Sequence, residues 1–170
     1  MKQINIEHYK SPYGELILGS FDGKLCLCDW RYRKMRNAID NRIKKGLKAE
    51  YLKHSDVVLE EARLQLEEYF SYKRKTFNIP LLMQGTEFQI KVWNGLIKIP
   101  YGETSSYLGL AKNIANSKSV RAVANANGAN AISIFIPCHR IIGSNGKLVG
   151  YAGGLKAKAK LLNLEHDLFA

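Results

Sequence analysis

The chain has 170 residues, of which 46% are hydrophobic, enough to bury the core of one large globular domain or two small ones. Its net charge of +11, from 26 basic and 15 acidic residues, favours a polyanionic partner without identifying one. No apolar run approaches the roughly 20 residues of a membrane span, and no signal-type segment follows Met1. These features argue against a membrane or disordered protein and predict a cytoplasmic, nuclear or nucleoid location.

The first thirty residues alternate short apolar segments with turn signals. Asp22 and Gly23 lie between two strand-like runs, a pattern typical of a hairpin, so we expect a small antiparallel sheet. The densely basic run that follows, residues 31–48, contains one acid, Asp40, and we interpret it as a solvated face.

The cysteines Cys26, Cys28 and Cys138 are an odd number with no disulfide framework, which suits a reducing compartment. Cys26 and Cys28 are separated by one residue, a spacing that places both side chains on one face of a strand. Two small buried apolar residues are a commoner outcome for such a pair than a metal site. We therefore expect no metal.

From Asp56, a candidate N-cap, apolar residues recur at helical spacing and predict an amphipathic helix packed on the sheet. They are Leu59, Ala62, Leu66, Tyr69 and Phe70. Residues 78–85 then lack a clear period and include proline and glycine. We place the domain boundary there, which gives an N-terminal α/β domain, 1–85, and a C-terminal domain, 86–170.

The C-terminal half begins with the capping-box sequence of Thr86 to Gln89, which predicts a helix that ends before Pro100. Ser105 or Ser106 is a candidate cap for a second helix, and Ser117 for a third that runs to Asn127. Two short helices with a tight connection are typical of a helix-turn-helix. Near the end, Asn145-Gly146 favours a tight turn and residues 155–164 predict a closing helix.

Between these helices lies the motif Ile136-Pro137-Cys138-His139-Arg140-Ile141-Ile142, which follows an apolar, strand-like run at residues 131–136. The motif places a thiol beside an imidazole and a guanidinium. A thiolate is the nucleophilic form of cysteine, and a nearby cation lowers its pKa toward neutral. We therefore predict a reactive thiol, although adjacent side chains often point apart and do not by themselves establish a dyad.

This motif resembles the active-site signature of the O6-alkylguanine-DNA alkyltransferases, and the resemblance extends from about Thr86 to Glu165. It implies a mixed α/β layer beside a mainly helical, winged-helix-like helix-turn-helix domain. It also implies a monomer that repairs duplex DNA containing O6-alkylguanine, mainly O6-methylguanine. The flipped base would pass its alkyl group irreversibly to Cys138, in a single turnover that needs no cofactor.

The resemblance assigns the catalytic residues in turn. His139 takes the proton of Cys138 through a bound water, and Glu165 orients and charges the histidine. Tyr107 assists loss of the guanine and turns the 3′ phosphate, and Asn130 is a hinge between the recognition helix and the active-site turn. From the residues alone, Glu165 is an exposed helix-end acid and Tyr107 an ordinary packed tyrosine.

Other residues are assigned to DNA and to the base. Arg121 matches an arginine finger that fills the stack, and Ser119 and Ala122 lie in the same DNA-binding segment, where Ala122, Ala124 and Ala126 keep the helix slim for the minor groove. The loop of Tyr151, Ala152 and Gly153 resembles the alkylguanine pocket. Backbone carbonyls of Cys138 and Ile141 would accept from the guanine amino group.

Three other functions are compatible with parts of this pattern. An alkyltransferase-like protein binds alkylated DNA without reacting, but such proteins commonly carry tryptophan at the position of Cys138. A helix-turn-helix regulator leaves the Cys, His and Glu residues unexplained. A cysteine hydrolase leaves Arg121 and the helix pair unexplained.

Overall fold

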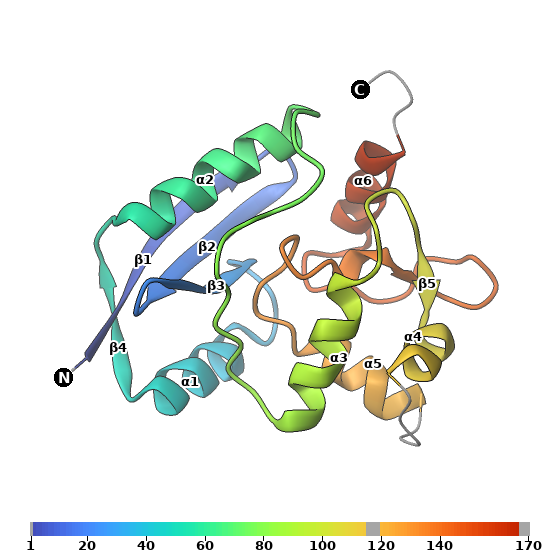
Figure 1. Cartoon of the computed structure of the whole chain (residues 1–170), viewed down its shortest axis with the longest axis horizontal. Helices are drawn as coiled ribbons and strands as arrows, with labels where there is room; N and C mark the ends of the chain where they lie inside the picture. Colours follow the sequence, from blue (N-terminus) through green and yellow to red (C-terminus); the bar gives the residue numbers. More distant parts are fainter. Residues whose placement is uncertain (1, 115–119, 167–170) are drawn as a thin grey trace.

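The computed structural model describes residues 2–114 and 120–166, as a sheet flanked by helices beside a largely helical half (Figure 1). The sheet has four strands in the order β3-β2-β1-β4. They are β1 (Lys2–Ser11), β2 (Gly14–Phe21), β3 (Lys24–Trp30) and β4 (Ala49–Lys53). The first three, which lie within the first thirty residues, are antiparallel as predicted, and a fourth strand that was not predicted, β4, pairs parallel to β1. A helix between β3 and β4 returns the chain in the parallel direction.

The helices α1 (Arg36–Leu47) and α2 (Val57–Phe70) cover opposite faces of the sheet (Figure 1). Asp56 caps α2 as predicted, since its carboxylate accepts from the Leu59 amide at 2.9 Å. Helix α1 lies in the basic run that was interpreted as solvated, and that interpretation was wrong in part. Ile39 and Ile43, four residues apart, are buried against the sheet. This spacing of two apolar residues within a charged segment was the feature of the sequence that indicated a helix.

A bulge in β3 separates the two N-terminal cysteines. Leu18 pairs with Cys28 but Ser20 pairs with Leu25, so one extra residue is accommodated between them. Cys26 lies in the core on the α1 side of the sheet, whereas Cys28 lies in the core on the α2 side. The predicted common face was therefore wrong, because a one-residue shift in register reverses the side of every later residue.

The C-terminal half contains α3 (Glu87–Ile97), α4 (Tyr107–Asn113), α5 (Val120–Gly128) and α6 (Leu155–Glu165). The capping box is present. The backbone amide of Gln89 donates to the Thr86 hydroxyl at 3.1 Å, and the backbone amide of Thr86 donates to the side-chain oxygen of Gln89 at 3.0 Å. Ser106 caps α4, and α4 packs against α5 as a helix pair. Ser117 and Ser119 lie outside the described residues.

Residues 131–136 form no regular strand. They meet β3 at one isolated bridge, where Cys28 donates its amide to the Ala131 carbonyl at 2.9 Å and accepts from the Ser133 amide at 2.7 Å. Ile134 has φ +73°, a value that breaks an extended run. The predicted strand is thus a short attachment that ties the segment before Cys138 to the edge of the sheet.

Two smaller elements complete this half. β5 (Ser105–Ser106) and β6 (Ile141–Ile142) form a short parallel ladder. The predicted Asn145-Gly146 turn is present, with the Gly146 amide donating to the Gly143 carbonyl at 2.8 Å.

One hydrophobic core joins the two halves. Leu16 and Leu66 from the sheet and α2 belong to the same buried cluster as Trp93 of α3 and Leu161 of α6. The core is therefore continuous across the predicted boundary near Gly85, and the division into two domains stays a prediction. Among the described helices, none combines the length and apolar character needed to cross a bilayer.

Candidate active site

Cys138 begins the single-turn helix η1 (Cys138–Arg140), directly after Pro137, and is 4% exposed. Asn130 holds the backbone around this turn: its side-chain amide donates to the Ile136 carbonyl at 2.9 Å, and its oxygen accepts from the Ile132 amide at 2.9 Å. Both bonds satisfy buried backbone groups that have no place in regular structure. Asn130 therefore connects the end of α5 to the reactive turn. These are the two segments that the predicted hinge residue was expected to join.

Glu165 is buried at the end of α6 and receives hydrogen bonds from several side chains. The His139 Nε2 atom lies 2.7 Å from Oε2, and Arg140 donates through Nε to Oε1 at 2.8 Å and through Nη2 to Oε2 at 3.0 Å. The Tyr69 hydroxyl donates to Oε2 at 2.6 Å. Burial alone would raise the pKa of Glu165, but the hydrogen bonds and charge of His139 and Arg140 outweigh it and hold the pKa far below its usual range. The carboxylate is thus ionised.

His139 is fully buried, and burial lowers its pKa despite the opposing influence of Glu165. The imidazole is therefore neutral at pH 7. An ionised carboxylate only accepts hydrogen bonds, so Nε2 carries the proton and Nδ1 carries a lone pair. Nδ1 is buried and has no hydrogen-bond partner among the described residues. The Glu165 contact thus leaves a base atom on the other side of the ring.

The thiol of Cys138 is not activated in the way the motif suggested. Burial raises its pKa, and the side chain of Asn130 and the charge of Arg33 offset this only in part. The guanidinium of Arg140, which was expected to lower the pKa, instead binds Glu165 and the Ile99 carbonyl, the latter at 2.7 Å. The resting residue is a thiol, so a base has to remove its proton during the reaction.

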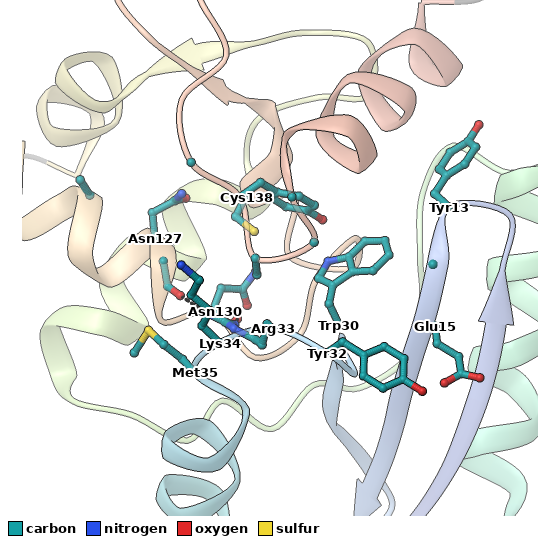
Figure 2. Close-up of a pocket in the computed structure, with 18 of the residues that line it drawn as sticks. Tyr13, Glu15, Trp30, Tyr32, Arg33, Lys34, Met35, Asn127, Asn130 and Cys138 are labelled. Atoms are coloured by element: carbon teal, nitrogen blue, oxygen red, sulfur yellow. Dashed lines mark hydrogen bonds between the residues drawn. The ribbon is translucent and has the colours of Figure 1, made fainter.

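Cys138 opens onto a cavity of about 720 Å³ that both halves of the chain line (Figure 2). Of the predicted site residues, the lining includes Tyr107, Asn130, Cys138, Tyr151, Ala152 and Gly153. Ile141 is buried in β6 and is not among the lining residues. His139 and Glu165 lie behind the cavity wall, buried within the core. Sequence reasoning missed the wall contributed by the N-terminal half, which includes Tyr13, Trp30 and Arg33.

Trp30, the last residue of β3, packs tightly against the pocket loop. A Cβ atom at Gly153 would lie 2.6 Å from the indole, and the rings of Trp30 and Tyr151 meet edge to face at 5.8 Å. Burial raises the pKa of the Tyr151 phenol, and the Trp30 indole and the Ser133 hydroxyl beside it oppose that shift. Apart from one another, these three buried polar groups have no hydrogen-bond partner among the described residues. Buried polar groups with so few partners are rare in protein cores, and a role in binding is one explanation for them. The glycine at position 153 was the feature of the sequence that could have indicated this close contact, because a residue with a side chain would clash there.

The residues predicted to bind DNA lie on the helix pair. Arg121 is exposed near the start of α5, while Ala122 and Ala124 are partly buried. Ala126 is buried, and its carbonyl accepts from the Trp93 indole at 2.8 Å, so its small size serves core packing rather than a slim outer face. Tyr107 begins α4, and burial raises its pKa, which keeps the phenol protonated.

Together, the fold and site define a protein that presents a buried cysteine, backed by a histidine and a glutamate, beside a helix-turn-helix. Two family models match the chain: the 6-O-methylguanine DNA methyltransferase ribonuclease-like domain over residues 4–83, and the DNA binding domain of the same family over residues 87–167. The chain belongs to the 6-O-methylguanine DNA methyltransferase family, which confirms the expected resemblance.

Individual relatives agree with this assignment. A methylated-DNA–protein-cysteine methyltransferase of Methanosarcina acetivorans is 43% identical over 157 residues, covering 92% of this chain and 95% of that one. The constitutive methylated-DNA–protein-cysteine methyltransferase of Bacillus subtilis is 54% identical over 108 residues, covering 63% and 66% of the two chains. A crystal structure of Mycobacterium tuberculosis OGT in complex with DNA superposes with a TM-score of 0.80 at 35% identity, covering 96% and 92%. The predicted fold class is confirmed.

Proposed function

We propose that this protein repairs O6-alkylguanine, chiefly O6-methylguanine, in duplex DNA by moving the alkyl group irreversibly to Cys138. The observation that carries this proposal is a cysteine facing a cavity of about 720 Å³, while the adjacent His139 is kept neutral by burial and is oriented by a buried Glu165. Its relatives are methylated-DNA–protein-cysteine methyltransferases, and one is solved in complex with DNA.

The reaction is a displacement at the alkyl carbon. The sulfur of Cys138 forms a bond to this carbon, and the bond from the carbon to O6 of guanine breaks with its electron pair staying on the base. The thiol proton passes to Nδ1 of His139 through a water, and the ionised Glu165 stabilises the resulting imidazolium through Nε2. The thioether is stable, so each molecule acts on one lesion.

The departing guanine anion needs a proton or a hydrogen bond. Tyr107 lines the cavity and keeps its phenol proton because burial raises its pKa, so it is suited to donate to the base. Ala152 and Gly153 line the same cavity, and their backbone amides are proposed to donate to O6. Tyr151 also lines the cavity, and its ring is proposed to cover the base.

A base inside an intact duplex cannot reach Cys138, so the nucleotide has to be flipped out, at a cost of a few kcal/mol. Helix α5 borders the cavity through Ala124 and Asn127. Arg121, exposed on the same helix, is proposed to enter the stack where the base was. We expect a monomer to carry out this step alone.

The test is to incubate the protein with a duplex containing O6-methylguanine under reducing conditions, and then to weigh the protein and map the adduct by mass spectrometry. One methyl group on Cys138, with guanine restored in the DNA, is the expected result. Tight binding with the lesion retained would instead indicate an alkyltransferase-like protein. Repeated turnover of an ester or peptide would indicate a hydrolase.

A further inference from the structure

We propose that the loop between β3 and α1, residues 31–35, is a second DNA-contacting surface, which meets the backbone of the duplex beside the extruded nucleotide. This inference rests on the proposed function, since it concerns the path by which the damaged base enters the cavity. It assigns a role in DNA binding to the N-terminal half, outside the helix-turn-helix.

The cavity has one wall from each half of the chain. On one side lie Tyr107, Asn127 and Gly128 of the helix pair; on the other lie Tyr32, Lys34 and Met35 of the loop. Figure 2 shows the labelled loop residues across the pocket from the sulfur of Cys138. A nucleotide that enters from a duplex lying on α5 has to pass between these walls, so the phosphates that flank it come within reach of the loop.

The loop has the chemistry of a backbone contact. Tyr32 is 77% exposed and Met35 51% exposed, values too large for residues that serve only the core. Lys34 is exposed and forms no ion pair with any residue in the described part of the chain. Arg31, in contrast, is paired with Glu15 at 2.7 Å. A free ammonium group flanked by exposed apolar surface suits a phosphate and its neighbouring sugar.

The loop is also held rigidly against the recognition helix. The Arg33 guanidinium donates to the Gly128 carbonyl at 2.7 Å and to the Asn130 carbonyl at 3.3 Å, so it caps the negative end of α5. Asp29, fully buried, pairs with Arg33 at 3.1 Å and with Arg36 at 3.0 Å. The loop and α5 therefore present a preorganised surface, which lowers the entropic cost of binding.

The test compares Lys34→Gln with a matched control, Lys24→Gln, by fluorescence anisotropy on a duplex containing O6-methylguanine across a range of salt concentrations. Both changes are made in Cys138→Ala protein, so that the lesion is bound without being removed. Lys24 is exposed and lies at the opposite end of β3, so both variants lose the same charge. Loss of one phosphate contact lowers the slope of log Kd against log salt by about 1. We expect this change for Lys34→Gln only, together with a severalfold weaker affinity.

Equal slopes for the two variants, or an unchanged slope for Lys34→Gln, would overturn the inference. Tyr32→Ala is the second variant: we expect it to weaken binding severalfold at high salt without changing the slope, because its contact is not ionic. Alkylation of the unmodified protein on the same duplex is followed separately. Normal alkylation with equal slopes contradicts only the loop contact, whereas no alkylation with a lowered slope for Lys34→Gln contradicts only the proposed chemistry.

Discussion

The two sides of His139 differ in how completely their polar groups are paired. On the Glu165 side, the carboxylate is surrounded by donors from His139, Arg140 and Tyr69. On the opposite side, Nδ1 of His139 is buried without a partner among the described residues, and the Tyr151 hydroxyl and the Trp30 indole nitrogen have no partner there beyond each other and Ser133. The paired side holds one geometry and one protonation state, and the unpaired side leaves atoms able to bind a substrate.

This difference also explains why the thiol rests in its protonated form. A permanent cation beside Cys138 would give a thiolate that reacts with unrelated electrophiles. Here the positive charge of Arg140 is neutralised by Glu165, and burial raises the pKa of the thiol. Deprotonation of the thiol therefore depends on the neutral histidine acting as a base.

The largest effect is expected from Cys138→Ala. Removing the nucleophile should abolish alkyl transfer completely while DNA binding persists, because the helix pair and the loop surface remain. Mass spectrometry measures the transfer and anisotropy the binding. If both were lost together, the separation of chemistry from binding would be wrong.

Glu165→Gln tests the side of His139 on which the polar groups are fully paired. It leaves Arg140 without its buried counter-charge and His139 without its orienting acceptor, so we expect a loss of about 3–5 kcal/mol in the free energy of unfolding. Alkyl transfer should slow by roughly 10²–10⁴-fold. Denaturant unfolding and single-turnover kinetics measure the two effects. The exposed Glu103→Gln makes the same chemical change and should alter neither.

Asn130→Ala tests the connection between α5 and the reactive turn. It leaves the Ile136 carbonyl and the Ile132 amide unsatisfied in the core, at about 1–3 kcal/mol for each group. Chemical denaturation gives the loss, with the exposed Asn163→Ala on α6 as the control. A loss no larger than that of the control would mean that water replaces the amide at little cost.

Gly153→Ala perturbs the unpaired side. The new methyl group would lie 2.6 Å from the Trp30 indole, and overpacking of this kind costs about 1–3 kcal/mol. Trp30→Leu in the same chain should recover part of the loss, and a double-mutant cycle in urea measures the coupling. The control is Gly128→Ala, whose methyl group meets no atom within 4 Å. Additive effects would contradict a direct contact.

The smallest effect concerns pH. Since burial lowers the pKa of His139 below its unfolded value of about 6.5, its contribution to stability is complete above that pH and is lost as the pH falls through and below it. Glu165, whose pKa is lowered, adds a second loss below about pH 4.3. Thermal unfolding from pH 8 to 5 should show a decline that His139→Asn flattens. The exposed His54→Asn should leave the decline unchanged.

Local signals predicted many individual elements correctly. The cap at Asp56 and the capping box at Thr86 are as expected, because each depends on side chains within three residues of the helix start. Helix α1 was missed because its apolar pair, Ile39 and Ile43, is surrounded by charges. The segment at 131–136 was predicted to be strand-like but meets β3 at an isolated bridge only. An apolar run by itself does not show whether the segment pairs with a neighbouring strand along its length.

The sequence by itself determined the family and the reactive motif. A cysteine, a histidine and an arginine in consecutive positions are a local feature, which can be recognised without knowing what lies near them in space. Only the tertiary structure decided the state of that cysteine. Its pKa depends on burial, on the pairing of Arg140 with Glu165, and on a neutral His139, and Glu165 lies 26 residues from His139 along the chain. The cavity likewise exists because Trp30 and Arg33, more than a hundred positions before Cys138, meet it across a shared core. Charge and solvation depend on what is near in space, and proximity in space is what a linear sequence does not state.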